Sequence, residues 1–316
     1  MSGLIIAVPS KGRLKEQVEA WLADCGLTLE VTGGARGYLA SLKGLPGAQV
    51  RLLSAADIAD ALDAGEVHLG ITGEDLLRER GEDLDSRLLL LRALGFGRAD
   101  LVTAVPKSWL DVETMADLEE VAHDYLARTG RRMRVATKYL TQTRGFFARH
   151  GIADYRITES GGATEGAPAA GSAELVVDIT TTGATLVANG LKVLGDGVML
   201  KSQAQLAASL RADWGPDALR QAERLLRIVE ARAAALKSAA LAWPQRGDAA
   251  ETEAVAALTA KGATRRPGGL LVDSAEVADA SLLLTAAGLG PVTASRPEFV
   301  FDVQCFAFNT LSARVF

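Results

Sequence analysis

The sequence predicts an α/β protein whose parallel sheets are covered by helices. Over roughly the first two-thirds of the 316 residues, short apolar runs of strand length alternate with amphipathic stretches of helix length. Such an alternation is typical of β-α-β units, in which crossover helices cover both faces of a parallel sheet. The remaining third has a different pattern, and a chain of this length is expected to form two or three domains.

The expected elements follow in order along the chain. Apolar runs predict strands at residues 4–8, 50–54, 68–72, 88–94, 101–105, 133–137, 155–158 and 175–179. Amphipathic stretches predict helices at residues 13–25, 114–129 and 141–150, and a further helix that ends at residue 62.

Four of the predicted strands are followed by chemically active loops. In an open parallel sheet, ligands bind at the carboxyl ends of the strands. The segments after Val8, Thr72, Thr137 and Ile179 all contain polar, glycine-bearing or basic residues. The sequence therefore predicts that these four loops line one shared cleft.

The last third begins with a long predicted helix. Pro216 and Asp217 are typical of a helix start, and apolar residues recur at helical spacing as far as Leu236. A polar break follows at residues 244–248 and is typical of a linker. Beyond it we expect a small separate α/β domain with a short helix, a strand at 270–272, a helix at 274–287 and a strand near 299–308.

Composition narrows the classes of partner and the location. The net charge of −5 provides no basic surface for a nucleic-acid duplex or an anionic membrane, so an anionic ligand needs a local cluster of cations. The two cysteines, Cys25 and Cys305, have no metal-binding or redox spacing, and we expect buried thiols in a reducing compartment. The apolar run at the start is too short for a signal sequence, and no later run is long enough to span a membrane. We therefore expect a soluble, cytoplasmic protein.

The strongest local signal is the segment 176–186. An apolar strand reaches Asp178, and three threonines (180–182) and Gly183 then lead into a predicted helix. Free N–H groups and partial positive charge at a helix start attract phosphate, and glycine lets the backbone approach the ligand closely. The Asp178 carboxylate could accept hydrogen bonds from ribose hydroxyls or hold Mg²⁺. The simpler interpretation is that Thr182 only caps the helix, but three successive threonines beside a carboxylate favour a phosphate site.

This segment resembles a loop that binds phosphoribosyl pyrophosphate. Purine-salvage enzymes with such a loop usually have two adjacent acidic residues before it, whereas here Val177 precedes Asp178. The better match is the ATP phosphoribosyltransferase family. Its signature runs from a glutamate to the loop, and this chain supplies Glu165, Gly171, Ala173, Val176, Asp178, Thr182, Gly183, Thr185 and Leu186. Further segments of this chain resemble family segments in the same order, at residues 8–14, 68–75, 94–98, 136–144 and 188–191.

The resemblance implies a fold and a reaction. The fold has two α/β lobes like those of type II periplasmic binding proteins, with the substrates in the cleft between them. The implied divisions are a first lobe at 1–98 and 192–212, a second lobe at 99–191, a connecting helix at 213–245 and a small α+β, ferredoxin-like domain at 246–316. In this family, adenine N1 of ATP attacks C1 of phosphoribosyl pyrophosphate and displaces pyrophosphate, in the first step of histidine biosynthesis.

The resemblance also implies roles for particular residues. Because a substrate supplies the nucleophile, the protein has to hold two highly anionic substrates together with Mg²⁺ and cationic side chains. The residues implied for phosphoribosyl pyrophosphate are Glu165, Asp178, Thr180, Thr181, Thr182, Gly183, Ala184 and Thr185. Those implied for ATP are Lys11, Gly12, Arg13, Gly73, Asp75, Arg98, Lys138 and Arg144. Asp178, Lys11 and Arg13 are expected to be catalytic. Asp178 is also the candidate ligand of Mg²⁺, which would be held mostly by substrate phosphates, whereas Asp75 could be an ordinary acid of an early helical turn.

Two positions depart from the family pattern. Ser54 stands where members often carry an arginine, so one cationic contact is missing or supplied by another part of the chain. After Arg98, the usual small residue followed by a basic residue is replaced by Ala99 and Asp100. Both departures bear on the contacts to pyrophosphate.

The family has a short form, which needs a regulatory subunit related to histidyl-tRNA synthetase, and a long form with a fused regulatory domain. The length of this chain agrees with the long form, which implies feedback inhibition by histidine and a homo-hexamer. The alternative is that residues 246–316 serve only oligomerisation. Two other functions are a two-lobed small-molecule binding module and a catalytically silent regulatory paralogue. No secretion signal supports the first, and the intact Asp178 and threonine–glycine loop disfavour the second.

Overall fold

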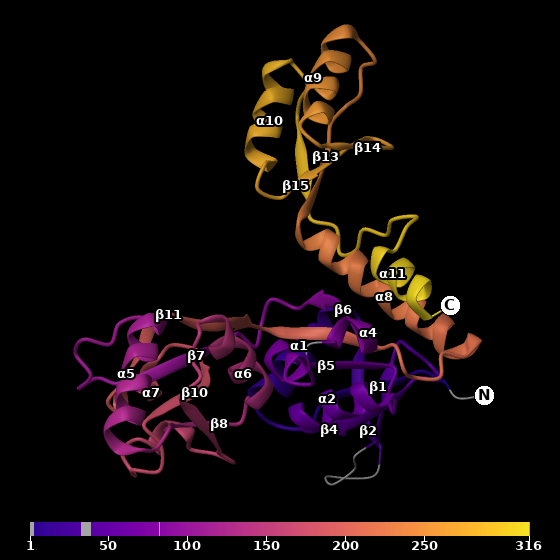
Figure 1. Cartoon of the computed structure of the whole chain (residues 1–316). Coiled ribbons are helices and arrows are strands. Elements are labelled where there is room, and N and C mark those ends of the chain that lie inside the picture. Colours follow the sequence, from indigo (N-terminus) through magenta and orange to yellow (C-terminus); the bar gives the residue numbers. More distant parts are fainter. Residues whose placement is uncertain (1–2, 33–38, 82, 316) are drawn as a thin grey trace.

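The chain forms two neighbouring α/β lobes and a third domain at the end of a long helix (Figure 1). The computed structural model describes residues 3–32, 39–81 and 83–315. Within these ranges, no helix is both long and apolar enough to cross a membrane. The predicted two-lobed α/β architecture with a small C-terminal domain is confirmed.

The first lobe is a seven-stranded mixed sheet in the order β2-β3-β4-β1-β5-β12-β6. Its strands are β1 (Ile5–Pro9), β2 (Thr28–Thr32), β3 (Leu39–Lys43), β4 (Gln49–Leu53), β5 (Leu69–Gly73), β6 (Leu88–Ala93) and β12 (Ala204–Ser209). Its helices are α1 (Gly12–Asp24), α2 (Ala55–Ala64), α3 (Glu74–Arg78) and α4 (Leu84–Arg87). Only β4, β1 and β5 run parallel, so the expectation of wholly parallel sheets is wrong. The other pairs are antiparallel: β12, which returns from the second lobe, pairs with β5 and β6, and β3 pairs with β2 and β4.

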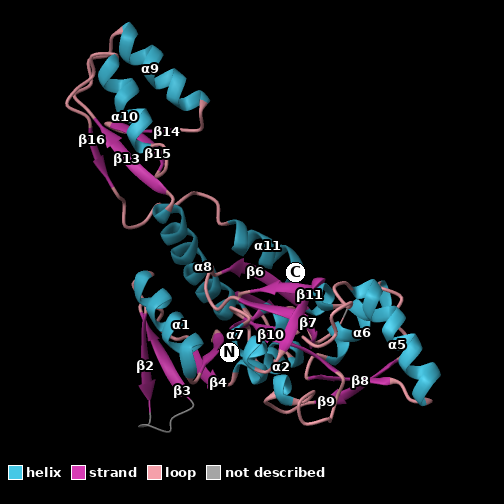
Figure 2. Cartoon of the chain, turned by 90° about the vertical axis from the view of Figure 1, so that its left-hand side faces the viewer, coloured by secondary structure: helices cyan, strands magenta, loops and turns pink. Residues whose placement is uncertain are grey.

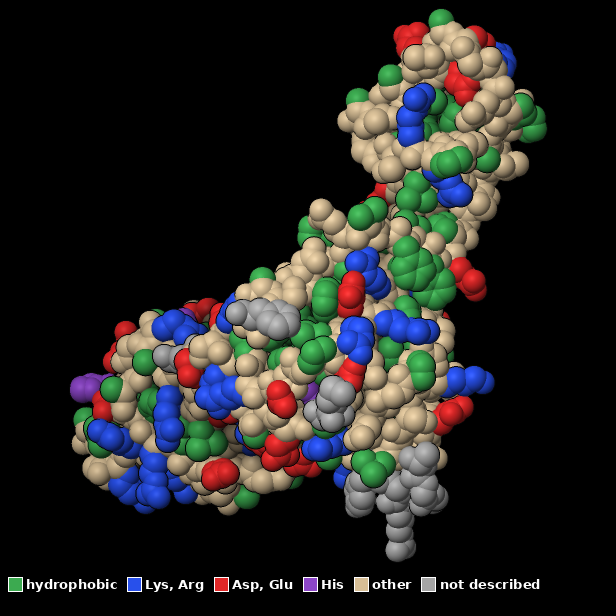
Figure 3. All heavy atoms as spheres, turned by 90° about the vertical axis from the view of Figure 1, so that its right-hand side faces the viewer, with side chains coloured by type: hydrophobic (Ala, Val, Ile, Leu, Met, Phe, Trp, Pro, Cys, Tyr) green, Lys and Arg blue, Asp and Glu red, His purple; other side chains and the backbone are tan. Residues whose placement is uncertain are grey.

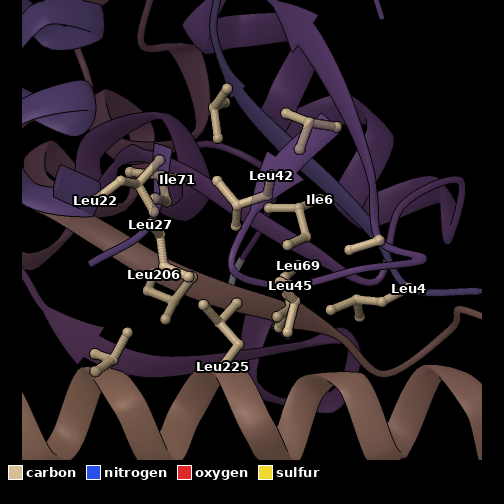
Figure 4. Packing of buried hydrophobic residues seen from close by; sticks show 14 of the residues in the cluster. Leu4, Ile6, Leu22, Leu27, Leu42, Leu45, Leu69, Ile71, Leu206 and Leu225 are labelled. Atoms are coloured by element: carbon tan, nitrogen blue, oxygen red, sulfur yellow. The ribbon is translucent and has the colours of Figure 1, made fainter. Parts of the chain in front are cut away.

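Helix α8 (Pro216–Leu236) packs on one face of this sheet (Figure 4). Side chains at alternate positions of a strand share a face, so Ile6 and Ile71 both point toward α8 and meet Leu225. The opposite face packs on Ile58 and Leu62 of α2. Burying each of these side chains contributes about 1.5–3 kcal/mol, and both faces of the sheet are covered in this way.

The second lobe is a five-stranded sheet in the order β11-β7-β10-β8-β9. Its strands are β7 (Ala99–Pro106), β8 (Met133–Thr137), β9 (Tyr155–Glu159), β10 (Leu175–Thr180) and β11 (Leu191–Ser202). Its helices are α5 (Met115–Thr129), α6 (Leu140–Arg149), the short α7 (Ala184–Ala188) and a 3₁₀ turn, η1 (Thr164–Gly166). Because β11 pairs with β7 as far as Ser202, residues 192–202 belong to this lobe and not, as predicted, to the first.

The C-terminal domain has the ferredoxin-like β-α-β-β-α-β order. It comprises β13 (Ser238–Ala242), α9 (Ala249–Ala260), β14 (Thr264–Arg266), β15 (Gly269–Asp273), α10 (Val277–Ala286) and β16 (Thr293–Ser295), with strand order β14-β15-β13-β16. Figure 2 shows α9 and α10 together on one side of the sheet. Strand β13 therefore belongs to this domain and not to the predicted connecting segment 213–245.

The end of the chain leaves the C-terminal domain and returns to the first lobe. Where a strand was predicted near 299–308, residues 299–305 form neither strand nor helix, and helix α11 (Phe306–Val315) follows and packs on α8 and β6. The Glu230 carboxylate of α8 accepts the N–H groups of Phe306 at 3.1 Å and Ala307 at 2.7 Å. These bonds satisfy two unpaired donors at the helix start, and Leu311 is buried in the core of the first lobe. The C-terminal domain therefore ends with β16, and not at residue 316 as predicted.

A buried carboxylate holds the loop that enters the C-terminal domain. Glu251 accepts hydrogen bonds from the N–H groups of Arg246 and Gly247, both at 2.7 Å, and from Trp243 Nε1 at 2.9 Å. The bonds from Gly247 and Arg246 hold the pKa of Glu251 below its usual range. Because the folded pKa is lowered, this stabilisation is complete above the usual value and is lost as the pH falls through the lowered one.

We predict that Glu251→Gln destabilises the C-terminal domain at pH 7, because an amide accepts these three donors more weakly than a carboxylate does. The difference from the unmodified chain should shrink below about pH 4, where the unmodified carboxyl also becomes protonated. Amide hydrogen exchange of β13 and β15 in the full chain measures the effect. The exposed Glu253→Gln is the control, and equal exchange in the two variants at pH 7 would contradict the prediction.

Candidate functional site

The two lobes are joined by two short connections. Residues 94–98 lead from β6 to β7, and Gln203 leads from β11 back to β12. Hydrogen bonds tie these connections together: Leu94 N–H donates to Ala204 O at 2.9 Å, Ala204 N–H to Phe96 O at 2.9 Å, and Gly95 N–H to Gln203 Oε1 at 3.1 Å. The carboxyl ends of β1 and β5 from one lobe and of β8 and β10 from the other are the four strand ends predicted to line the cleft.

Three cavities meet at Ala99 and Thr181, which line all of them. A cavity of about 490 Å³ between the lobes is lined by Arg13, Gly73, Asp75 and Arg98, among others. A second cavity, of about 270 Å³, lies on the second lobe and is lined by Glu165, Asp178, Thr180, Thr182 and Thr185. A third, of about 430 Å³, lies beside it along the sheet edge. Six of the eight residues predicted for phosphoribosyl pyrophosphate and four of the eight predicted for ATP therefore line adjoining spaces.

The predicted phosphate loop forms a tight turn after β10. Gly183 has φ +76°, a left-handed conformation that favours glycine. Its N–H donates to Thr180 Oγ1 at 2.8 Å, and Thr181 Oγ1 donates to Arg98 O at 3.3 Å, which ties the loop to the connection between the lobes. In the described part of the chain, the N–H groups of Thr181 and Thr182 donate no hydrogen bond. Two free amides beside threonine hydroxyls provide donors for an anion.

The simpler interpretation of Thr182 as a helix cap receives little support. The residue at the cap position of α7 is Gly183, and no side chain caps this helix. Ala184 N–H reaches Thr182 Oγ1 only at 3.4 Å, beyond the usual range of a strong hydrogen bond. The Thr182 hydroxyl therefore remains available to donate to a ligand.

Asp178 is the acidic group of this pocket. Burial raises the pKa of Asp178, whereas the N–H of Ile179, which donates to Oδ1 at 2.8 Å, and the positive charge of Lys138 act in the opposite direction. Glu165, on the 3₁₀ turn, lines the same cavity and adds negative charge. The pair offers carboxylate oxygens to hydroxyl groups or to a bound cation.

The predicted cations are distributed over the cleft unevenly. Arg13 and Arg98 line the space between the lobes. Lys11 and Gly12 lie exposed at the start of α1 and do not line it. Arg144 is exposed on α6 and lines none of the three cavities. Ser54, where an arginine was expected, accepts the N–H of Asp57 at 3.2 Å and caps α2.

Asp75 has a task that the sequence did not reveal. It is only 6% exposed, and its carboxylate accepts hydrogen bonds from the hydroxyl groups of Tyr139 at 2.6 Å and Ser202 at 2.7 Å, both from the second lobe.

The nearby Glu79, which follows α3, makes similar bonds. Its carboxylate accepts the N–H groups of Thr141 at 2.8 Å and Gln142 at 3.2 Å at the start of α6. We call this set of bonds between α3 and the second lobe the interlobe clasp. Asp75 also lines the cavity between the lobes, so this role adds to the predicted contact with ATP, which stays a prediction.

The clasp residues carry no local sequence signal. Tyr139 and Ser202 lie 64 and 127 residues from Asp75, so only the folded chain brings them together. Burial, followed by the charge of Asp75, raises the pKa of Tyr139 above its usual range. The phenol therefore stays protonated and donates its hydrogen bond at neutral pH.

We predict that Tyr139→Phe lowers stability by about 1–3 kcal/mol at pH 8, because it leaves a buried carboxylate oxygen without its donor. Above about pH 10 the unfolded chain loses the phenol proton while the folded chain keeps it, so the free energy of unfolding of the unmodified protein falls. The difference in this free energy between the unmodified protein and the variant should therefore become smaller. Calorimetric melting at both pH values measures this. Tyr155→Phe is the matched control, because the Tyr155 hydroxyl forms no hydrogen bond within the described residues. Equal shifts for both variants would rule the clasp out.

Comparisons with known proteins agree with this arrangement. A family model for ATP phosphoribosyltransferase (HisG) matches residues 54–230. An ATP phosphoribosyltransferase from Caulobacter vibrioides is 68% identical over 299 residues, which are 95% of this chain and 93% of the relative. One from Bradyrhizobium sp. is 59% identical over 238 residues, 75% of this chain and 73% of the relative.

A solved structure supports the fold of the lobes. The ATP phosphoribosyl transferase (HisG:HisZ) complex from Thermotoga maritima contains a chain that is 25% identical, with a TM-score of 0.53. The match covers 98% of that chain but only 72% of this one, so this protein carries additional residues. From the family match and the high identity over almost its whole length, the chain belongs to the ATP phosphoribosyltransferase family.

Proposed function

We propose that the cleft binds ATP and phosphoribosyl pyrophosphate side by side and catalyses the glycosyltransferase reaction of histidine biosynthesis. The observation that carries this proposal is the continuity of the pockets. The cavity of Asp178 and the threonine loop adjoins the cavity of Arg13 and Arg98, so two anionic substrates would meet beside Thr181. The lone pair of adenine N1 then forms the bond to C1, and the C1–O bond breaks with its electrons going to pyrophosphate.

The residues on the second lobe suit phosphoribosyl pyrophosphate. The free amides and hydroxyls of the loop from Thr180 to Thr185 would bind the 5-phosphate. Asp178 and Glu165 would accept the ribose hydroxyls. As pyrophosphate leaves, positive charge develops on the ribose, and the partly buried carboxylate of Asp178 would stabilise it more than a solvated one could.

The residues that face this loop suit ATP. Gly73 lines the cavity between the lobes at the end of β5, and Arg13 and Arg98 bring positive charge to it. Lys11, Gly12 and Arg144 would approach the substrates from the exposed rim, and Lys138 from beside Asp178. In this proposal Asp75 positions the lobes and also borders the space for ATP.

Magnesium would be held mainly by the substrates. Within the described residues, no group of three or more histidine, cysteine or acidic side chains could hold a metal ion. Asp178 offers oxygen ligands next to a phosphate pocket, and Mg²⁺ prefers such ligands together with substrate phosphates and water. When bound, the ion would neutralise charge on the departing pyrophosphate.

We assign a regulatory role to the ferredoxin-like domain, with histidine as its ligand. The Thermotoga protein was solved together with HisZ, and it is shorter than this chain, which carries a domain of its own in addition to the lobes. That domain extends from the lobes on α8, as a regulatory module fused to an enzyme would.

The surface supports a homo-oligomer, which we propose to be a hexamer. Figure 3 shows hydrophobic side chains exposed between the C-terminal domain and the lobes. Phe301, Val303 and Phe306 are exposed in the segment that leads from β16 to α11 and at the start of α11. Val303 is 89% exposed, and clustered apolar side chains of this kind are typical of protein contacts. The free, buried thiols of Cys25 and Cys305 agree with a reducing compartment, and we propose the cytoplasm.

A direct assay tests the function. The purified chain should form phosphoribosyl-ATP from ATP, phosphoribosyl pyrophosphate and Mg²⁺ without a partner subunit, and histidine should suppress the rate. The ultraviolet absorbance of the product follows the reaction. Turnover that histidine leaves unchanged would contradict the regulatory role of the C-terminal domain. No turnover by the folded chain would contradict the enzyme as a self-sufficient unit.

We predict opposite effects of Asp178→Asn on activity and stability. The rate should fall by at least about tenfold, since contacts to a charged group contribute about 1.5–3 kcal/mol. Because the folded pKa of Asp178 is raised, ionising it costs stability above that pKa, whereas the cost is absent below its usual value near 3.9. The variant should therefore melt higher than the unmodified chain at pH 7 and equally at pH 3.5. The exposed Asp124→Asn is the control, and a lower melting temperature at pH 7 would disprove the stability argument.

A further inference from the structure

Three neighbouring strands of the second lobe meet at the edge of its sheet that faces the cleft. Thr180 at the end of β10 pairs with Asp100 near the start of β7, and Asp100 pairs in turn with Lys201 near the end of β11. Residues directly opposite each other in antiparallel strands project from the same face. Asp178, two residues before Thr180, shares this face. The side chains of Thr180, Asp100 and Lys201 therefore continue the phosphate pocket sideways across the sheet.

The third cavity lies over this row. It has a volume of about 430 Å³, and Lys201 lines it together with Asp100, Arg98, Thr180 and Thr181. Thr180 and Thr181 also line the pocket of Asp178, so the two spaces adjoin. Lys201 thus borders the space proposed for phosphoribosyl pyrophosphate, although it is distant in sequence from the loop.

The positive charge of Lys201 is available to a ligand. Within the described residues, Lys201 forms no salt bridge or side-chain hydrogen bond, and Asp100 opposite it does not come within salt-bridge distance. Lys192 on the same strand behaves differently, since its Nζ contacts a Glu113 oxygen at 2.6 Å. A lysine that lines a cavity without a protein partner has three donors to offer.

Acidic residues outnumber the two cations, Arg98 and Lys201, that line the two adjoining cavities. Asp178, Glu165 and Asp100 are all acidic and line these two adjoining cavities, and they would repel a phosphate. Asp100 stands where the family pattern has a basic residue, so the chain lacks one positive charge at that position. Lys201 is the residue that the neighbouring strand places opposite Asp100.

We infer that Lys201 binds a phosphate group of phosphoribosyl pyrophosphate and replaces the cation missing from position 100. The inference rests on the proposed function, because it requires this substrate to occupy the pocket. A lysine is suited to the task as a compact charge on a flexible stem, which reaches phosphate without a fixed geometry.

Calorimetric titration of the full chain in the presence of Mg²⁺ tests the inference. For Lys201→Met, phosphoribosyl pyrophosphate should bind about tenfold more weakly, as expected for the loss of one contact to a charged group, and ATP within about twofold of the unmodified chain. Lys107→Met is the matched control, because Lys107 is an exposed lysine at the opposite end of β7. Ribose 5-phosphate and pyrophosphate, titrated separately, identify which phosphate Lys201 contacts, and weakening of either one supports the inference.

A second pair of variants tests whether Lys201 contacts the substrate or only neutralises the charge of Asp100. In an Asp100→Asn background, Lys201→Met should still weaken binding about tenfold if the lysine contacts the substrate. Loss of that effect would overturn the inference, as would equal binding by Lys201→Met and Lys107→Met, or weakening confined to ATP. If the unmodified chain itself does not bind phosphoribosyl pyrophosphate, the proposed function fails first. Melting temperatures establish that each variant is folded.

Discussion

The buried carboxylate of Asp75 is the contact on which the arrangement of the site depends. A carboxylate removed from water is costly unless donors surround it, and its donors here come from the other lobe. The two bonds to Asp75 and the two to Glu79 all have a charged acceptor, and each such bond contributes about 1.5–3 kcal/mol. These four bonds therefore help to hold the lobes in the observed arrangement. Of the cavities that meet at Thr181, the one of about 490 Å³ depends on this distance, because residues of both lobes line it.

Two residues of the interlobe clasp are each preceded in the chain by a lysine. Tyr139 is buried against Asp75, and the preceding residue, Lys138, is exposed beside Asp178. Ser202 is likewise buried against Asp75, and the preceding residue, Lys201, lines the third cavity. In the extended strand β11, neighbouring side chains point to opposite sides, so anchoring Ser202 directs Lys201 away from Asp75 and toward the third cavity. The bond that joins Ser202 to Asp75 therefore also fixes the position of one positive charge beside the proposed phosphate pocket.

The sequence was sufficient for features that depend on neighbours in the chain. The strand that reaches Asp178 and the glycine turn at Gly183 follow from local preference, and both are where they were predicted. The sequence was not sufficient where partners are distant. Nothing near Asp75 indicates a bond to Tyr139, and the position of Lys201 opposite Asp100 requires the register of two strands. The prediction of a strand near residues 299–308 was wrong for a related reason. Residues 306–315 form a helix because Glu230 of α8 caps its start and the core of the first lobe buries Leu311, and both lie far away in the sequence.

The attachment of the C-terminal domain limits how it could influence the cleft. Both of its connections, α8 and the segment before α11, lead to the first lobe, and both views show the domain standing away from the second lobe (Figures 1 and 2). A ligand bound there has no direct contact with the phosphate loop. Helix α11, however, packs on β6, and β6 continues into the connection that ends at Arg98, whose carbonyl accepts the Thr181 hydroxyl. A shift of α8 and α11 would therefore reach the loop through the joint between the lobes, where a small rotation alters both substrate pockets at once.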